Sequence, residues 1–309
     1  MQSLSVPATS RSTCTSTVDL PFIEPFGWPA MLAFLGPRAF PGIETVSATR
    51  YRRVVLESEV PTIIGVTRVP HHPALTLAVD AAATPVAATV IERAIRFFDL
   101  RIDPEAMRLH LSQDSVLQRA LIGTPGIRIP GAWSGFELAV RAIIGQQVSV
   151  KAATTFAARL VSTYGAPLAA STDPDGDLVR TFPSPATLAR ADLTSIGLIR
   201  TRAKWISALA SVLVDAPDFF DRLGPLDRAI KELTRLPGIG AWTAHYIAMR
   251  ALREPDAFPT GDLGLMRAYG QLAGSGVTVR ELDAIAERWR PWRAYAAMHL
   301  WASEPAAGG

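Results

Sequence analysis

Apolar residues are spaced differently in the two parts of the chain. In the first part, short runs are β-branched or alternate between apolar and polar residues, which is typical of strands. These runs are Tyr51 to Ser58, Thr62 to Val69 and Leu75 to Asp80. A segment with an amphipathic helical pattern follows, from about Pro85 to Leu100. Beyond residue 103 only helical spacing remains, so the sequence predicts an α+β fold: a small antiparallel sheet domain with a helix, followed by an all-α region.

The same change of pattern gives the expected domain limits. We expect a disordered tail at 1–20, an N-terminal α+β domain at 21–118, a helical region at 119–303 and a loose tail at 304–309. Residues 1–20 are rich in Ser and Thr, and Arg11 is their only basic residue. They contain no apolar core of a secretory signal, so we expect a soluble, cytoplasmic protein.

Composition limits the kind of protein. Of 309 residues, 49% are hydrophobic and 19% are charged, which is enough to bury a full core. The net charge of +3 suits a polyanionic partner without requiring one. Cys14 is the single cysteine, so internal disulfides and all-cysteine metal sites are excluded, and the scattered histidines predict no metal site. No apolar run reaches the roughly 20 residues that span a bilayer.

A glycine hairpin is the most informative motif. It reads Leu236-Pro237-Gly238-Ile239-Gly240, and Pro237 should end the preceding helix. A new helix begins at once, with Trp242, Tyr246 and Met249 at helical spacing. The free amides at its start predict an anion site that fits a phosphate of a nucleic acid backbone. A turn that only packs two helices together is the alternative from spacing alone.

Two further turns carry polar groups. Ser134 and Glu137 predict a capping box that begins one helix, and Gly145 ends that helix. Gln146 and Gln147 then lie in the turn before the next helix, and from spacing alone this is a solvated polar turn. Farther on, a degenerate second hairpin precedes three basic residues, which either touch phosphates or form a solvated face: Arg200, Arg202 and Lys204.

Asp262 is the acidic residue of interest. It follows Pro259 and Gly261 and precedes an apolar run at helical spacing. From local sequence alone it is a helix N-cap, which is the usual function of Asp in such a place.

Several of these segments together resemble the helix-hairpin-helix DNA glycosylase superfamily. The hairpin with Ala241-Trp242-Thr243-Ala244, followed by Phe258 to Asp262, carries the resemblance. Further matches are the segments 25–35, 131–165 and 287–295. Within the superfamily the chain is most similar to the 3-methyladenine DNA glycosylase II family, from about Pro25 to Trp301. The resemblance implies two helical lobes in the helical region.

The resemblance also assigns residues. It implies that Asp262 is catalytic, that Phe34, Tyr246 and Trp301 line a pocket for a flipped base, and that Trp242 lies beside or in this pocket. The hairpin residues Leu236, Gly238, Ile239 and Gly240 would contact DNA. Gln147 stands where the best-known member has a leucine that fills the space left by the flipped base. Glutamine would hydrogen-bond there instead of stacking.

The implied reaction is cleavage of the N-glycosidic bond of alkylated purines in double-stranded DNA, as part of base excision repair. Positive charge develops on the sugar, and the Asp262 carboxylate would stabilise it. Electron-rich aromatic rings would attract the cationic base. Relatives that also cut the strand carry lysine where Trp242 stands, so we expect a monofunctional enzyme.

We expect a monomer in the bacterial cytoplasm, associated with the nucleoid, without a cofactor or resident metal. The resemblance adds an alkali ion that relatives often hold at the hairpin carbonyls. Two alternatives remain at this point: a glycosylase for another purine lesion, and a helix-hairpin-helix DNA-binding protein without catalysis.

Overall fold

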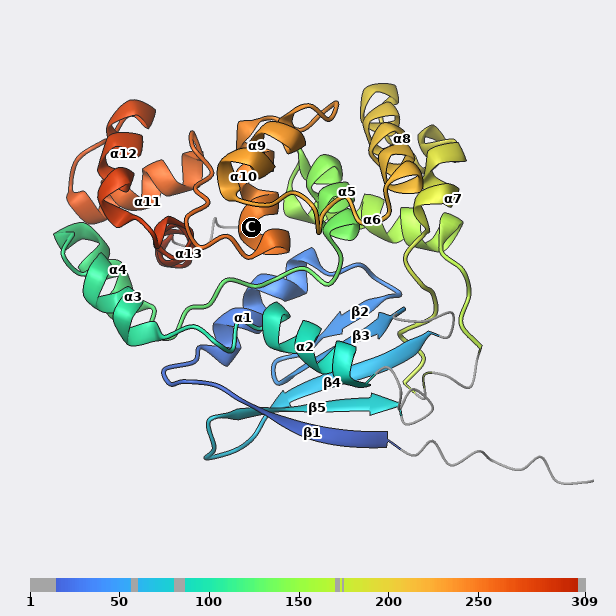
Figure 1. Ribbon diagram of the computed structural model, residues 1–309, viewed down its shortest axis with the longest axis horizontal. Helices are drawn as coiled ribbons and strands as arrows, with labels where there is room; N and C mark the ends of the chain where they lie inside the picture. The colour runs from blue at the N-terminus through green and yellow to red at the C-terminus, as the bar shows by residue number, and fades with distance from the viewer. Residues whose placement is uncertain (1–14, 57–60, 81–86, 170–172, 174, 305–309) are drawn as a thin grey trace, which may run out of the picture.

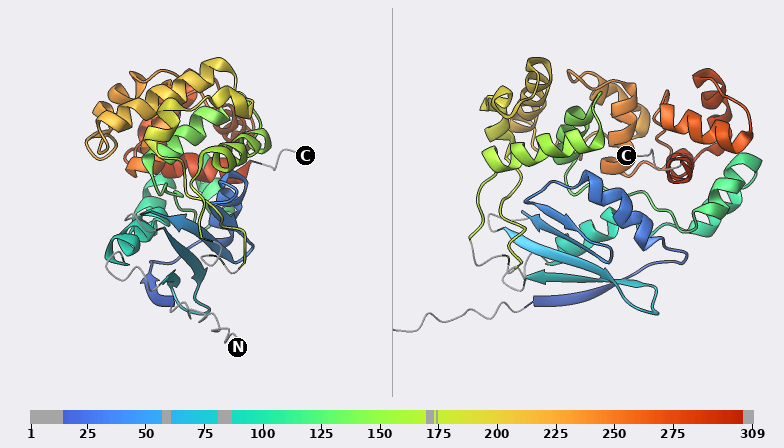
Figure 2. Two further views of the ribbon diagram at one scale, coloured as in Figure 1. Left: turned by 90° about the vertical axis from the view of Figure 1, so that its right-hand side faces the viewer. Right: turned by 180° about the vertical axis from the view of Figure 1, so that it is seen from behind.

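The computed structural model describes residues 15–56, 61–80, 87–169, 173 and 175–304. Figure 1 shows an antiparallel sheet on one side of the molecule and a layer of helices on the other. The two views of Figure 2 show the same division, with the C-terminal helices beside those that follow the sheet domain. The predicted α+β architecture is confirmed.

The sheet has five strands in the order β1-β5-β4-β3-β2, and all neighbouring pairs are antiparallel. The strands are β1 (Thr15–Pro21), β2 (Glu44–Val46), β3 (Arg50–Val55), β4 (Thr62–Arg68) and β5 (Ala74–Asp80). Strand β1 corrects the expected tail, because residues 15–20 pair along β5 instead of being disordered. Residues 1–14 of that predicted tail lie outside the described residues.

Two helices cover the sheet on the side that faces the helical region (Figure 1). They are α1 (Trp28–Leu35) and α2 (Ala87–Phe97). Their apolar residues form one core with the strands, in which the ring of Tyr51 lies 5.1 Å from that of Phe97 and 5.6 Å from that of Phe98. Phe34 is the partly buried residue of α1 that also packs against the C-terminal helices.

The remaining helices form two lobes, each with its own core. The first lobe contains α5 (Gly135–Gly145), α6 (Val150–Tyr164), α7 (Pro185–Arg190), α8 (Arg200–Asp215), α9 (Leu226–Thr234) and α10 (Ala241–Ile247). The second contains α3 (Pro104–Leu111), α4 (Ser115–Gly123), α11 (Leu263–Ala273), α12 (Val279–Ala286) and α13 (Arg293–Ser303). Helix α10 continues into a π-helical segment, Ala248–Leu252, whose residues contribute to both cores.

The cores do not divide at residue 118. Met107 and Leu111 of α3 lie within the expected sheet domain, yet they pack with the C-terminal helices. The second lobe is therefore built from two segments that are far apart in sequence, as Figure 1 shows for α3, α4 and α13.

Within the described parts of the chain, no helix is long and apolar enough to cross a membrane.

Candidate active site

Asp262 begins α11, as its local sequence predicted. Its Oδ1 accepts the backbone N–H of Leu265 at 2.8 Å and thus caps the helix. The same oxygen accepts the indole N–H of Trp301 at 3.0 Å, and Oδ2 accepts the indole N–H of Trp242 at 2.9 Å. The carboxylate is half-buried. Three donors from three segments therefore fix its position and leave part of it open to solvent.

The predicted aromatic residues gather around this acid. Trp242 and Tyr246 are four residues apart on α10, and their rings stack with a centroid distance of 5.2 Å and an interplanar angle of 11°. Trp301 meets Tyr246 edge to face at 6.5 Å. Trp242, Tyr246 and Trp301 are all half-buried. The structure thus brings together the three aromatic residues and the acid that the sequence grouped only by resemblance.

Phe34 lies next to this group and is engaged by two arginines. The Arg38 guanidinium lies 4.1 Å from the centre of the Phe34 ring, and that of Arg250 lies 5.0 Å from it. Arg250 also donates to the Tyr246 hydroxyl at 2.7 Å. Burial raises the pKa of Tyr246, but the positive charges of Arg250, Arg38 and Arg141 lower this pKa by more than burial raises it. The phenol is therefore more acidic than usual.

The glycine hairpin forms as predicted between α9 and α10. Gly238 has φ +81°, and a Cβ there would lie 2.3 Å from the Trp205 ring of α8. A side chain is therefore excluded at Gly238 both by the backbone and by the tryptophan. Gly240 has no heavy atom within 4 Å of a would-be Cβ and is exposed. Its missing side chain leaves open space at the surface.

The Gln146-Gln147 turn lies beside the hairpin. The Gln146 side-chain amide donates to the Gly238 carbonyl at 2.7 Å and to Thr243 Oγ1 at 3.3 Å. Gln147 is exposed, with φ +56°. The Gln146 carbonyl accepts from Arg202 at 2.5 Å. Arg202 is buried and donates to the turn, so it does not form a solvated face.

The capping of α5 differs in part from the prediction. Ser134 accepts the N–H of Glu137, but the Glu137 carboxylate pairs with Arg53 at 2.8 Å instead of returning to the helix start. The Glu137 and Arg53 side chains lie at the junction between the sheet and the first helical lobe. Glu137 thus connects the two parts of the molecule.

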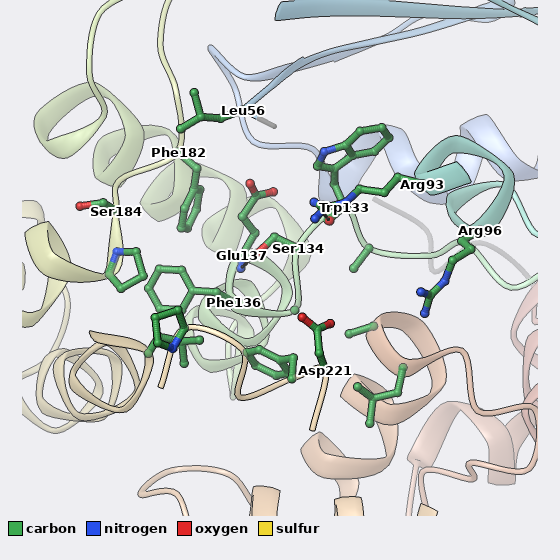
Figure 3. A pocket seen from close by; sticks show the side chains of 18 of the residues that line it. Leu56, Arg93, Arg96, Trp133, Ser134, Phe136, Glu137, Phe182, Ser184 and Asp221 are labelled. Carbon is green, nitrogen blue, oxygen red and sulfur yellow. Dashed lines mark hydrogen bonds between the residues drawn. The ribbon is translucent and has the colours of Figure 1, made fainter. Parts of the chain in front are cut away.

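A cavity of about 800 Å³ lies away from Asp262, where the first helical lobe faces β3 and α2. Figure 3 shows Phe182 and Ser184 at one side of it and Arg93 and Arg96 at the other. None of the predicted site residues is among its described lining residues. The carboxylate, the aromatic rings and the hairpin therefore define the candidate site better than cavity size does.

Sequence reasoning missed two residues that the structure places at this site. Glu304 lies in the segment expected to be loose, yet one of its oxygens approaches Asp262 over Gly264. The sequence places Gln146 only in a polar turn, whereas its side chain joins that turn to the hairpin. Among the residues that the structure describes, no cluster of His, Cys, Asp or Glu is suited to hold a metal ion.

The fold and the site define a helix-hairpin-helix protein whose hairpin lies beside a firmly held carboxylate. Residues 17–134 match the AlkA N-terminal domain, and residues 140–293 match the HhH-GPD superfamily base excision DNA repair protein. The chain is 34% identical over 285 residues to the "DNA-3-methyladenine glycosylase 2" of Escherichia coli K12, covering 91% of this chain and 95% of that protein. The chain therefore belongs to the HhH-GPD superfamily, in the branch that carries the AlkA N-terminal domain.

Two other similarities agree with this family. The chain is 41% identical over 293 residues to the "Probable bifunctional transcriptional activator/DNA repair enzyme AlkA" of Mycobacterium tuberculosis, covering 94% of this chain. It spans only 58% of that relative's length. The 3-methyladenine DNA-glycosylase structure from Archaeoglobus fulgidus has the same fold, with a TM-score of 0.80 at 22% identity over 93% of this chain and 98% of that one.

Proposed function

We propose that this protein is a monofunctional DNA glycosylase. It would flip an alkylated purine of the 3-methyladenine class out of double-stranded DNA and hydrolyse its N-glycosidic bond, leaving an abasic site for base excision repair. The observation that carries the proposal is the Asp262 carboxylate, which Leu265, Trp242 and Trp301 hold among aromatic rings. A fixed negative charge beside the sugar stabilises the positive charge that develops as the base leaves.

The aromatic group supports a cationic substrate. Trp242, Tyr246 and Trp301 offer electron-rich faces, and contact with a cation is worth about 0.5–2 kcal/mol. Phe34 is already in contact with Arg38 and Arg250, so we assign recognition of the cationic base to the other three rings and the shape of the pocket to Phe34. The indole of Trp242 has no nucleophilic amine, which supports release of the base without strand cleavage.

The hairpin and the neighbouring turn support binding to duplex DNA. Leu236, Gly238, Ile239 and Gly240 would contact a phosphate through backbone groups, with no preference for sequence. Gln147 is exposed and would enter the duplex when the base flips. An alkali ion at the hairpin carbonyls would strengthen the phosphate contact. A monomer acting on genomic DNA in the bacterial cytoplasm is the setting that this function implies.

The test is release of methylated bases from alkylated duplex DNA. Asp262→Asn should retain the helix cap, because Asn is also a good N-cap residue, but should lose most base release. Asp114→Asn is the matched control: Asp114 also caps a helix and accepts an indole N–H, that of Trp289 at 3.1 Å, far from the hairpin. Samples are assayed with and without alkali, and alkali-dependent nicking identifies an abasic product.

If Asp262→Asn releases bases at the wild-type rate, Asp262 is not the catalytic group. If neither protein releases a base but both bind duplex DNA, the chain is a DNA-binding protein without this catalysis. Release of an oxidised purine instead of methylated bases would indicate a glycosylase for another lesion.

A further inference from the structure

A second carboxylate lies close to Asp262. Glu304 follows α13, three residues after Trp301, and its carboxylate lies beside the start of α11. A Cβ at Gly264 would be 3.0 Å from Asp262 Oδ1, 3.0 Å from Glu304 Oε2 and 3.5 Å from Trp301 Cδ1. The two carboxylate oxygens are therefore separated by no more than about 6 Å, twice 3.0 Å. Both oxygens border the position where Gly264 has no side chain.

The two carboxylates differ in how their oxygens are occupied. Three hydrogen-bond donors hold the two oxygens of Asp262. In Glu304 only Oε1 is held: it accepts from Arg267 Nε at 2.7 Å and lies 2.6 Å from Arg267 Nη2. No hydrogen bond to Oε2 occurs within the described part of the chain. The Glu304 side chain is 25% exposed, so water reaches it.

This difference gives the two acids different chemical capacities. A carboxylate has about four lone-pair sites, and those of Asp262 are mostly used by donors that keep its charge in place. Asp262 is therefore suited to stabilise positive charge on the sugar, and less suited to take a proton. Glu304 Oε2 is fixed through Oε1 but has free lone pairs, which is what a general base requires.

We propose that Glu304 is a second catalytic carboxylate of this site and acts as the general base for the attacking water. The water would lie over Gly264, between Asp262 Oδ1 and Glu304 Oε2. This proposal rests on the proposed glycosylase function and extends it. In inverting enzymes that hydrolyse sugars, one carboxylate of a pair likewise acts as general base and activates the attacking water.

Hydrolysis breaks one bond at the sugar C1′ and forms another. The bond between the sugar C1′ and the base nitrogen breaks, and its electron pair leaves with the cationic alkylated purine, which becomes neutral. The water oxygen forms the new bond to C1′. One water proton passes to Glu304 Oε2 and then to solvent, so the products are the free base, an abasic sugar with a hydroxyl group and one proton.

Gly264 is a necessary part of this arrangement. A methyl group at 3.0 Å from both oxygens would occupy the space of the water and push the carboxylates apart. Gly264→Ala should therefore slow base release although alanine favours a helix. Gly123→Ala is a matched control, since Gly123 lies in α4 and has no heavy atom within 4 Å of a would-be Cβ.

The main test compares single-turnover base release from methylated duplex DNA by wild type, Glu304→Gln and Glu105→Gln. Glu105 is the control, because its carboxylate also pairs with an arginine, Arg108, but lies exposed on α3. Glu304→Gln should be slower by tenfold or more, while its affinity for abasic-site DNA stays within about twofold. Added formate should restore part of the rate to Glu304→Ala but not to Asp262→Asn.

The failures of the two proposals are distinguishable. If wild type releases no methylated base, the glycosylase function and this inference both fall. If wild type is active and Glu304→Gln has the same rate, only the role of Glu304 is refuted. A slow Glu304→Ala that formate does not rescue also counts against a general base and indicates a structural role.

Discussion

The indole N–H of Trp242 donates to Oδ2 of Asp262 at 2.9 Å, across 20 residues of sequence. Trp242 lies two residues after the hairpin, whereas Asp262 begins a helix of the second lobe. This bond therefore links the hairpin, the proposed DNA contact, to the proposed catalytic acid. It also shows what tryptophan does at this position: it holds the acid and provides an aromatic face.

Trp242→Phe should slow base release by about 10- to 100-fold. The ring remains for stacking, but Asp262 loses one of its three donors, and a hydrogen bond to a charged group is worth about 1.5–3 kcal/mol. Single-turnover rates measure the effect, with Trp292→Phe as a control for loss of an indole elsewhere. A variant within twofold of the wild-type rate would show that the bond does not position the acid.

The two glycines of the hairpin should respond differently to alanine. Gly238→Ala should destabilise the protein by about 2–4 kcal/mol, because its Cβ meets Trp205 and its φ is positive. Gly240→Ala should leave the free energy of unfolding nearly unchanged, since its Cβ meets no atom within 4 Å. It should nevertheless weaken binding to all duplex sequences alike, because the methyl group enters the space proposed for a phosphate.

Urea unfolding and duplex binding at constant salt separate these effects. If Gly240→Ala binds DNA as wild type does, the phosphate does not approach at that position. A loss confined to some sequences would likewise contradict a backbone contact.

The elements of the site were predictable from sequence because their signals are local. Pro237 and the two glycines indicate the hairpin, and Asp262 after Gly261 indicates a helix start. Trp242 and Tyr246 are four residues apart, so their shared face follows from helical spacing alone. Asp114 has the same local signal as Asp262 and also accepts an indole N–H, so a capping aspartate does not by itself define an active site.

The remaining features depend on contacts between distant segments. Trp301 and Glu304 approach Asp262 because α13 packs against α11, which no local pattern specifies. Strand β1 was missed because it is an edge strand in which only Leu20 is buried, so its residues do not alternate. It forms because β5 offers it an unpaired edge.

Gln146→Ala should impair base flipping more than folding. Its side chain ties the Gln146-Gln147 turn to the Gly238 carbonyl, so without it the turn and the hairpin can move separately. Fluorescence of 2-aminopurine beside a lesion measures flipping and should rise less than with wild type, while the free energy of unfolding falls by about 1 kcal/mol. Gln118→Ala on the exposed face of α4 is the control. Wild-type fluorescence from Gln146→Ala would refute the coupling.

Gln147→Leu tests the neighbouring position. If Gln147 enters the duplex as proposed, leucine would stack where glutamine would hydrogen-bond, so flipping should become less sensitive to the base on the opposite strand. The positive φ of residue 147 opposes leucine, and we expect a stability loss of about 1 kcal/mol. Rates with each of the four opposite bases measure the effect, and an unchanged dependence would show that Gln147 does not enter the duplex.

His299 should make the protein less stable in mild acid. It is 2% exposed, and Thr124 Oγ1 lies 2.6 Å from its Nδ1. Because the Thr124 hydroxyl donates its proton to the Ala120 carbonyl at 2.8 Å, Nδ1 must be the donor, and Nε2 is the site that would be protonated. Within the described residues Nε2 has no partner, and burial lowers the pKa of His299 to about 4.

The direction of this pH effect on stability follows from the pKa of His299 in the folded and the unfolded protein. The unfolded chain takes up a proton near the ordinary pKa of about 6.5, whereas the folded protein does so only near 4. Stability is therefore unaffected well above pH 6.5 and falls as the pH decreases toward 4, by about 3 kcal/mol in total and about 2 kcal/mol at pH 5. Urea unfolding at about pH 7.5 and pH 5 should show a smaller decrease for His299→Gln than for wild type. His72→Gln, at an exposed histidine, should behave as wild type does. Burial also lowers the pKa of His245, so part of the decrease should persist in His299→Gln. Equal decreases in all three proteins would mean that His299 is protonated as readily in the folded state as in the unfolded chain.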